Sequence, residues 1–467
     1  MNGRKFEKTR LGITVIAALA GAALIATSAL AQTEVTEVTD EAVETSNPSA
    51  PPTTERAKPQ PIVISNLHAH DARALNQFEP PKRETLPYEG FKLQWGAAFT
   101  QQFQSLRHEN SADPNLVGTP PVNTNQLIKI GSGFNNAEAN LFMDAQLGRG
   151  IRVAMTSYLS SRRHTETWVK DGYLLIDGSP WENEKLDNLF KYLTLKVGHF
   201  EINYGDMHFR RSDNGQAMFN PLVGNLLMDA FTTEVGGEAY VRGGDFLGMV
   251  AVTGGEVRGN VLKPEQRSPS VIAKLGYDRQ LTPVARVRLT GSFYNSEKSI
   301  NNTLYTGSRS GSRYYYVVEN LNATEAAQAW SGDVRPGYNR KVQAMVVNPF
   351  VKFHDLELFG NIEQAKGRTL TETSERTWNH YAAEAVYRLF ENRVYVAGRW
   401  NTAKGDLAGL ANEVTVDRIQ GGGGWFISPN MLAKIEYVEQ KYKNFPPSDI
   451  RNGAKFNGAV FEAVVSF

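Results

Sequence analysis

The feature that most constrains the fold of this chain is an alternation of apolar and polar residues, repeated in short segments through most of its length. In 91–106, for example, Trp95 and Phe99 lie on one side of the alternation, and Gln102 and Gln104 lie on the other. Successive side chains of a β-strand point to opposite faces, so each segment predicts a strand with one apolar and one polar face.

Counting these segments predicts an all-β fold of sixteen strands, an even number that suits a closed transmembrane antiparallel β-barrel. The predicted strands are 91–106, 133–147, 151–161, 165–177, 191–202, 233–242, 246–256, 269–279, 284–297, 339–353, 356–366, 377–389, 393–403, 413–427, 431–443 and 455–467. The alternation changes phase within 165–177 and 339–353, which leaves fourteen or eighteen strands as alternatives.

The connections between the predicted strands are alternately short and long. Short turns such as 243–245 and 428–430 are followed by long polar segments such as 298–338 and 444–454. Membrane barrels have this asymmetry, with tight periplasmic turns and long extracellular loops. Soluble barrels imitate parts of the pattern, but they have no reason to repeat it so regularly. We therefore expect residues 91–467 to form the transmembrane barrel.

The N-terminus has the pattern of a secretory signal. Basic residues precede an apolar stretch at 11–25, and the small-residue site Ala29-Leu30-Ala31 predicts a signal peptide at 1–31. No later stretch of about 18 apolar residues follows, and the mean hydropathy is −0.39, which excludes a bundle of membrane helices.

Two further segments separate the predicted signal from the barrel. Residues 32–60 are rich in Thr, Glu, Pro and Ser and poor in aromatic residues, so we expect a disordered periplasmic tail. Residues 61–90 are more apolar but contain several prolines, which disfavour a long helix. We expect 61–90 to be a periplasmic segment at the barrel mouth.

Composition and motifs give little support to catalysis or to nucleic-acid binding. The formal net charge is +1 and there are no cysteines, so neither a basic surface nor a thiolate metal site is expected. The sequence has no Gly-x-Ser-x-Gly motif, and His68, His70 and Asp71 lack a further group of metal ligands. We therefore expect no enzyme activity, no cofactor and no bound metal.

The final segment of the chain is an alternating strand that ends on an aromatic residue. Ala459, Phe461, Ala463 and Val465 share one face with Phe467, the last residue of the sequence. A terminal aromatic residue after such a strand resembles the signal that the outer-membrane barrel assembly machinery recognises.

A second resemblance lies in 193–205 (LTLKVGHFEINYG), followed by Arg210, Arg211, Asp213 and Asn214. This passage is similar to the strand-to-loop passage of bacterial porins, including the phosphate-selective group. The resemblance implies a sixteen-stranded homotrimer in the outer-membrane lipid, with a water-filled channel for passive diffusion of small hydrophilic solutes and ions.

Two other functions remain open from the sequence. The chain lacks the dense lysine and arginine ladder of the phosphate-selective porins, so phosphate specificity is not expected, but another substrate-specific channel, including an anion channel, is an alternative. The second alternative is a barrel without transport that serves as an adhesin or anchor. Its contact surface would be the loop 298–338 with Tyr305, Tyr314, Tyr315 and Tyr316.

If the strand count holds, 203–232 is the loop that in sixteen-stranded porins folds into the lumen and narrows the pore. Fixed charges at a narrow passage act strongly on passing ions. The predicted pore-constriction residues are Asp206, His208, Arg210, Arg211, Asp213 and Asp229.

Strand parity predicts which charged residues line the lumen wall. The predicted wall residues are Arg152, Lys196, Arg242, Arg286, Arg288, Arg388, Arg399, Lys434, Glu234 and Glu238. Inward acidic positions are about as numerous as inward basic ones, which predicts a weak ion preference. Arg286 and Arg288 could form a local anion-attracting strip, and wall salt bridges are the alternative use of the same residues.

Overall fold

The structure, a computed structural model, describes residues 64–80, 82, 88–161, 167–257, 261–311, 313–410 and 412–467. The predicted signal peptide at 1–31 and the predicted tail at 32–60 lie outside the described residues. The chain divides into two units, residues 1–60 and 61–467, and the description below concerns the second unit.

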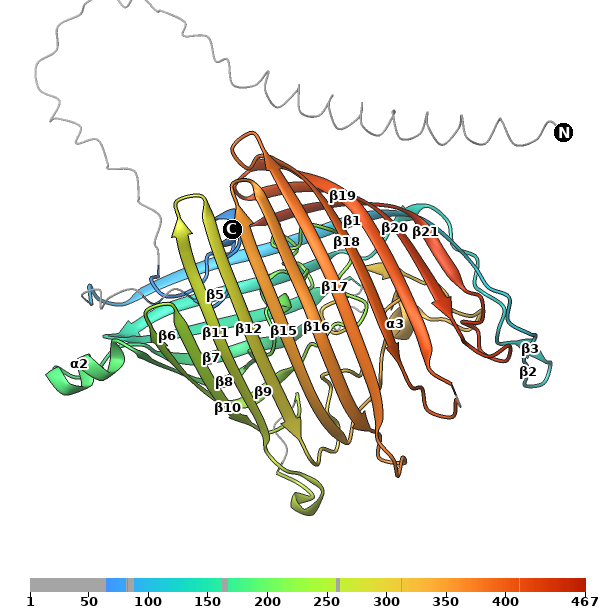
Figure 1. The fold of residues 1–467 in the computed structure, drawn as a ribbon, viewed down its shortest axis with the longest axis horizontal. Coiled ribbons are helices and arrows are strands. Elements are labelled where there is room, and N and C mark those ends of the chain that lie inside the picture. Colours follow the sequence, from blue (N-terminus) through green and yellow to red (C-terminus); the bar gives the residue numbers. More distant parts are fainter. Residues whose placement is uncertain are drawn as a thin grey trace, which may run out of the picture. The chain divides into compact units, whose positions relative to one another are not determined.

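In the part of the chain that the structure describes, sixteen long strands form one antiparallel sheet that closes into a barrel (Figure 1). Each strand pairs with the next, and the first strand pairs with the last. The strands of the wall are β1 (Lys92–Glu109), β5 (Glu138–Gly148), β6 (Ile151–Ser160), β7 (Thr167–Ile176), β8 (Leu193–Glu201), β9 (Thr233–Gly243), β10 (Phe246–Thr253), β11 (Ser270–Thr282), β12 (Ala285–Ser296), β15 (Lys341–Phe353), β16 (Leu356–Arg368), β17 (Arg376–Leu389), β18 (Val394–Gly405), β19 (Val414–Ser428), β20 (Met431–Lys443) and β21 (Lys455–Ser466). The predicted fold class and strand number are confirmed.

The remaining elements are short and belong to the connections. They are β2 (Leu116–Val117), β3 (Val122–Asn123), β4 (Gly133–Phe134), β13 (Tyr314–Tyr315), β14 (Trp330–Ser331), the helices α2 (Glu184–Phe190) and α3 (Glu325–Gln328), and 3-10 turns at Ala72–Ala74, Met207–Phe209 and Pro264–Gln266. None of the helices described is long and apolar enough to cross a membrane.

The barrel closes where β1 meets β21. Their register runs from Ala98 opposite Ser466 to Glu109 opposite Lys455. Phe467 continues this ladder beyond the end of β21, because its backbone N–H donates to the carbonyl of Ala97 at 3.0 Å and its own carbonyl accepts from the Ala97 N–H at 2.9 Å. The C-terminal residue therefore lies at the closing seam.

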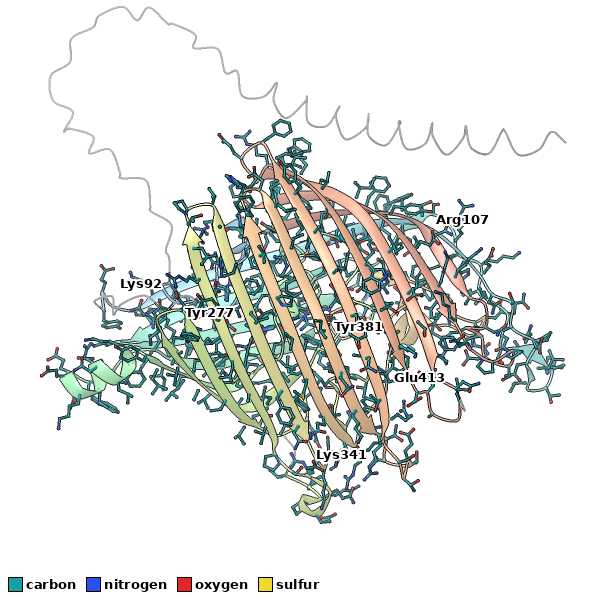
Figure 2. The ribbon with its side chains drawn as sticks, in the orientation of Figure 1. Lys92, Arg107, Tyr277, Lys341, Tyr381 and Glu413 are labelled. Carbon is teal, nitrogen blue, oxygen red and sulfur yellow. The ribbon has the colours of Figure 1, made fainter. Side chains whose placement is uncertain are left out.

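Side chains alternate between the interior and the outside along each strand. On β16, Glu357 and Glu363 are buried inside the barrel, whereas Ile362 between them is 52% exposed. On the outer surface, Figure 2 labels Tyr277 and Tyr381. The side chains therefore alternate with a period of two, as the sequence predicts. The outer face is apolar, and the inner face mixes charged side chains with apolar ones such as Val342 and Val346 of β15.

The two strands with irregular parity each contain a local irregularity. On β7 the register shifts so that Asp171 pairs with Thr156 and Val169 pairs with Ser157, which leaves Lys170 as an extra residue. An inserted residue of this kind reverses the alternation on the bulged strand. On β15 the alternation of buried and exposed side chains is unbroken, but its ladder to β16 skips Asn348 and Pro349, and Pro349 has no N–H to donate.

The two ends of the barrel carry different connections. Tight turns join the strand pairs at one end, for example at 244–245 and 354–355, and longer loops join them at the other. The connection between β7 and β8 is an exception at the tight-turn end, because it contains α2. The side chain of Asn183 caps this helix by accepting from the N–H groups of Lys185 and Leu186 at 3.1 Å.

Candidate functional site

The connection between β8 and β9, residues 203–232, lies inside the barrel, and nearly all of it is buried. It reaches strands on the other side of the wall. Gln216 Nε2 donates to Ser466 Oγ at 3.0 Å, and the N–H of Val223 donates to Glu436 Oε2 at 2.8 Å. The loop therefore occupies much of the interior and narrows it.

Asp206, the first predicted constriction residue, is an anchor of this loop. Its carboxylate lies 2.7 Å from Lys274 Nζ and 2.8 Å from Arg288 Nε, and it accepts from Thr290 Oγ1 at 2.9 Å. Burial alone would raise the pKa of Asp206, but Lys274 and Arg288 hold it below its usual value. The group is thus an ionised partner of two wall cations.

Two predicted arginines of the loop are also paired. Arg210 Nη2 lies 2.8 Å from Glu384 Oε1 on β17, and Arg211 Nη1 lies 2.5 Å from Asp229 Oδ1 within the loop itself. Both guanidinium groups are almost fully buried. Removing one partner of such a buried pair strongly destabilises the folded protein, because the other charge stays buried without a partner.

The remaining two predicted constriction residues, His208 and Asp213, also have partners inside the barrel. Asp213 forms an ion pair with Lys170, the bulged residue of β7. His208 Nε2 donates a hydrogen bond to Asn203 Oδ1 at 3.0 Å, and burial lowers the pKa of His208 well below the usual value. The structure therefore places all six predicted residues in the lumen, where they hold the loop in place instead of presenting bare charges to a passing ion.

All ten predicted wall residues have side chains on the inner side of the barrel, and most of them form ion pairs. The pairs are Arg152 with Asp177, Lys196 with Glu238, Arg286 and Arg288 with Asp278, Arg388 with Glu357, Arg399 with Glu384, and Lys434 with Glu462. Arg242 donates to the carbonyl of Pro80, and Glu234 accepts from Thr253 and Tyr294. Of the two uses predicted for Arg286 and Arg288, the structure therefore shows the wall salt bridges.

A second long connection, residues 297–340, also folds into the barrel. Arg313 Nη2 lies 2.7 Å from Glu462 Oε1, and Tyr314 OH donates to Glu436 Oε1 at 2.5 Å. The sequence predicts an external loop here, so Arg313 was not expected in the lumen. No periodic signal could have placed it, because the segment forms only short strands and one short helix.

The adhesin alternative assigned an external contact surface to four tyrosines of this connection, but three of them lie inside the barrel and Tyr316 is half-buried. Tyr305, Tyr314 and Tyr315 are buried, with at most 4% of each side chain exposed. Their hydroxyl groups find partners inside the barrel, such as Glu363, which accepts from Tyr305 at 2.5 Å. The hydroxyl group of a buried tyrosine usually has a hydrogen-bond partner of this kind.

The N-terminal segment, which we define as residues 64–80, crosses the interior near the tight-turn end. The N–H of Ala72 donates to the carbonyl of Pro429 at 3.0 Å, at the turn between β19 and β20. Asn76 Nδ2 donates to Glu357 Oε1 on β16 at 2.5 Å, and His70 Nε2 lies 2.9 Å from Asp144 Oδ2 on β5. The segment therefore lies across the opening of the barrel and contacts several parts of its wall.

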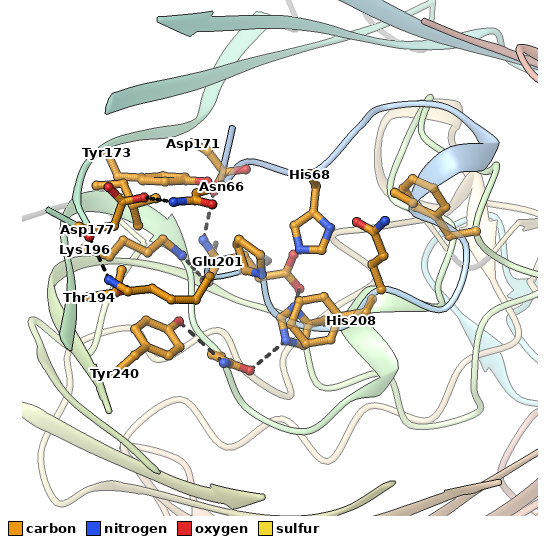
Figure 3. Close-up of a pocket in the computed structure, with 18 of the residues that line it drawn as sticks. Asn66, His68, Asp171, Tyr173, Asp177, Thr194, Lys196, Glu201, His208 and Tyr240 are labelled. Carbon is orange, nitrogen blue, oxygen red and sulfur yellow. Dashed lines mark hydrogen bonds and ion pairs between the residues drawn. The ribbon is translucent and has the colours of Figure 1, made fainter. Parts of the chain in front are cut away.

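A cavity of about 220 Å³ lies between the N-terminal segment, the loop 203–232 and the wall strands β7 to β9. Figure 3 shows His68 and His208 facing Tyr173, Lys196 and Glu201 across this space. The cavity has room for several water molecules, and its lining mixes basic, acidic and aromatic groups. It is a polar space inside the lumen.

His68 makes the position of the N-terminal segment sensitive to pH. Burial lowers its pKa from 6.5 to about 4, an effect that Glu79 opposes and that His70 and Arg242 reinforce. The docked segment therefore prefers neutral His68. Docking of the segment is therefore most stable above pH 6.5. As the pH falls toward 4, protonation of His68 weakens the docking by at most about 3 kcal/mol.

We expect the backbone amides of 64–80 to lose protection from hydrogen exchange when the pH falls from 7 to 4.5, after correction for intrinsic rates. Glu79 does not contribute in this window, because cations hold its pKa below its usual value. The variant His68→Gln should show no such change. Equal protection of the native segment at both pH values would contradict the role of His68.

His68 and His70 have different surroundings. His70 stacks on Phe142 with ring centroids 3.7 Å apart and contacts Asp144 Oδ2 at 2.9 Å, away from His68. Within the described ranges, no group of three or more His, Cys, Asp or Glu side chains is placed to hold a metal ion.

No protein-family model and no curated protein sequence matches the chain. In structure it is similar to the anion-selective porin from Comamonas acidovorans, with a TM-score of 0.50, 10% identity, and coverage of 81% of this chain and 100% of that porin. It is also similar to the outer membrane channel DcaP of Acinetobacter baumannii, with a TM-score of 0.48, 10% identity, and coverage of 82% and 100%. The first of these comparisons shows that the chain has the fold of an outer-membrane porin.

The distribution of apolar residues on this fold identifies its surroundings. Large side chains such as Leu275 and Met345 are 74% and 60% exposed on the outer face of a wall whose inner face is charged. A closed barrel with this arrangement satisfies all backbone groups of its wall within the sheet, which is the condition for crossing a bilayer. Barrels of this kind lie in the bacterial outer membrane.

Proposed function

We propose that this barrel forms a water-filled channel through which small hydrophilic solutes and ions diffuse passively across the outer membrane. The observation that carries the proposal is the set of charged and polar side chains that recur along the inner face of the wall. On β17, for instance, Arg376, His380, Glu384 and Arg388 lie on the inner face, with the apolar residues Trp378, Ala382 and Val386 between them. Ionised groups are costly to bury without water or partners, so a lining of this length favours a hydrated lumen. The proposal includes no catalytic step and no cofactor.

The pairing of the lumen charges supports a weak ion preference for this channel. Most wall cations face a carboxylate at hydrogen-bond distance, as Arg388 faces Glu357 at 2.7 Å. A paired charge offers a passing ion little net attraction, so neither cations nor anions should be strongly selected. The alternative of an anion channel is favoured by one group of wall cations, Arg242, Lys274, Arg286 and Arg288.

The proposal also covers assembly and partners. Phe467 extends the seam of the closed barrel beyond the end of β21, which supports a role of the terminal aromatic residue as an assembly signal. We propose that the barrel assembly machinery recognises this end, and that the mature protein is a homotrimer in outer-membrane lipid. The adhesin or anchor alternative has lost the contact surface assigned to it, because Tyr305, Tyr314 and Tyr315 are buried.

Reconstitution in planar bilayers tests the proposal. We expect stepwise conductance in KCl from the full chain, and a reversal potential close to zero in asymmetric KCl because the wall charges are paired. A chain without residues 61–90 serves as a second form, in which the N-terminal segment cannot obstruct the lumen. If neither form conducts, the channel proposal is overturned and a barrel without transport takes its place.

A further inference from the structure

Glu79 of the N-terminal segment is held in a site formed by two cations of the wall. Its Oε1 lies 3.0 Å from Lys274 Nζ, and its Oε2 lies 2.9 Å from Arg288 Nη2. Asn203 Nδ2 approaches Oε1 at 3.3 Å, and only 5% of the Glu79 side chain is exposed. This arrangement is typical of a bound carboxylate, because each of its two oxygens accepts a charge-assisted hydrogen bond.

The preceding residue, Phe78, fills an aromatic slot next to the carboxylate. Its ring centroid lies 5.2 Å from that of Phe350 and 6.0 Å from that of Phe209, both in edge-to-face geometry. The guanidinium carbon of Arg288 lies 4.3 Å from the Phe78 centroid. Arg288 thus stacks on the aromatic ring while its Nη2 binds the carboxylate of Glu79.

The charges around Glu79 do not balance without it. Four cations of the wall, Arg242, Lys274, Arg286 and Arg288, gather here. The loop carboxylate of Asp206 and the wall carboxylate of Asp278 face them. Glu79 is the third carboxylate, and it also attracts Arg242. Without Glu79, the site has an excess of positive charge in a partly buried place, where an anion is favoured.

A free solute has a space from which to reach this site. The cavity of about 220 Å³ is lined by Phe209 and Arg242, which also belong to the surroundings of Phe78 and Glu79. Pro80, the residue after Glu79, lines it as well. The cavity and the site are therefore adjacent, and they share Phe209 and Arg242.

We propose that Phe209, Lys274, Arg288 and Phe350, with Arg242 at the rim, form a binding site for small carboxylates that carry an aromatic ring. Phe78 and Glu79 are its tethered occupant, which a free solute displaces. The use of this site in transport rests on the proposed channel function, but the binding itself does not. A tethered competitor lowers the apparent affinity of a solute in proportion to the fraction of time that it leaves the site free.

The test is equilibrium binding of 3-phenylpropanoate to the full chain folded in detergent, measured by calorimetry. Glu79→Gln should bind this probe at least about tenfold more tightly than the native chain, because its occupant no longer competes as an anion. Glu89→Gln is the matched control. Glu89 also belongs to the region before β1, but its side chain is 66% exposed and pairs with Lys92. This control should bind the probe as the native chain does.

Two further comparisons define the ligand and the wall partner. Acetate, which lacks the ring, and 3-phenylpropanol, which lacks the carboxylate, should both bind Glu79→Gln at least about tenfold more weakly than the probe does, because each loses one half of the Arg288 contact. In Glu79→Gln/Lys274→Gln, the gain in affinity should disappear. Equal affinity of Glu79→Gln and the native chain for the probe would overturn the proposal, as would equal binding of probe and acetate.

The outcomes separate this inference from the proposed function. Probe binding by Glu79→Gln in a barrel that conducts no current would retain the site and overturn the channel. Conductance without any gain in binding would retain the channel and overturn the site.

Discussion

A chain that lacks residues 61–90 should conduct roughly three to ten times more current per channel than the full chain, because the N-terminal segment obstructs the lumen of the proposed channel. The segment contacts the wall at Asp144 on β5, at Arg288 on β12 and at Glu357 on β16, so it reaches across the barrel. The wall itself should persist, since its strands pair with one another and not with this segment. Single-channel recording in KCl measures the change.

The matched control for this deletion is a chain that lacks residues 32–60. It keeps every described contact of the segment 64–80 and should therefore conduct as the full chain does. If the deletion of 61–90 leaves the unit conductance unchanged, the segment does not limit the passage of ions. The conducting path would then have to run past it.

The second large effect is expected at Asp206. Replacing it by asparagine removes one of the carboxylates that face Lys274 and Arg288, which are 0% and 2% exposed. Leaving buried cations without their partner should lower the free energy of unfolding by about 3 kcal/mol. The same change adds positive charge to the lumen, so the reversal potential in asymmetric KCl should move toward anion selectivity.

Urea titration of the barrel in detergent and bilayer recording measure the two effects of Asp206→Asn. Asp245→Asn is the control, because Asp245 lies at an exposed tight turn and is 3.6 Å from Arg279. An exposed pair of this kind contributes little to stability. An unchanged unfolding midpoint together with an unchanged reversal potential for Asp206→Asn would show that Asp206 neither anchors the loop nor tunes the lumen charge.

The candidate site could be predicted from the sequence only in part. Parity placed Arg286 and Arg288 on the inner face, and the strand count placed Asp206 on a loop that enters the lumen. The site partners Lys274, Phe78 and Glu79 were missed. Lys274 had the correct parity for the interior but no local signal that distinguished it, and Glu79 lies in a segment without periodicity.

What the sequence by itself determined is the wall: the strands and the side of the barrel on which residues such as Glu238 and Arg399 lie. The reason is that alternation follows from the local geometry of the extended backbone, which each strand carries within itself. What only the tertiary structure decided is how the interior is filled. The pairing of Glu79 with Lys274, and of Arg313 with Glu462, joins segments far apart in sequence, so these contacts exist only once the barrel has closed around its loops.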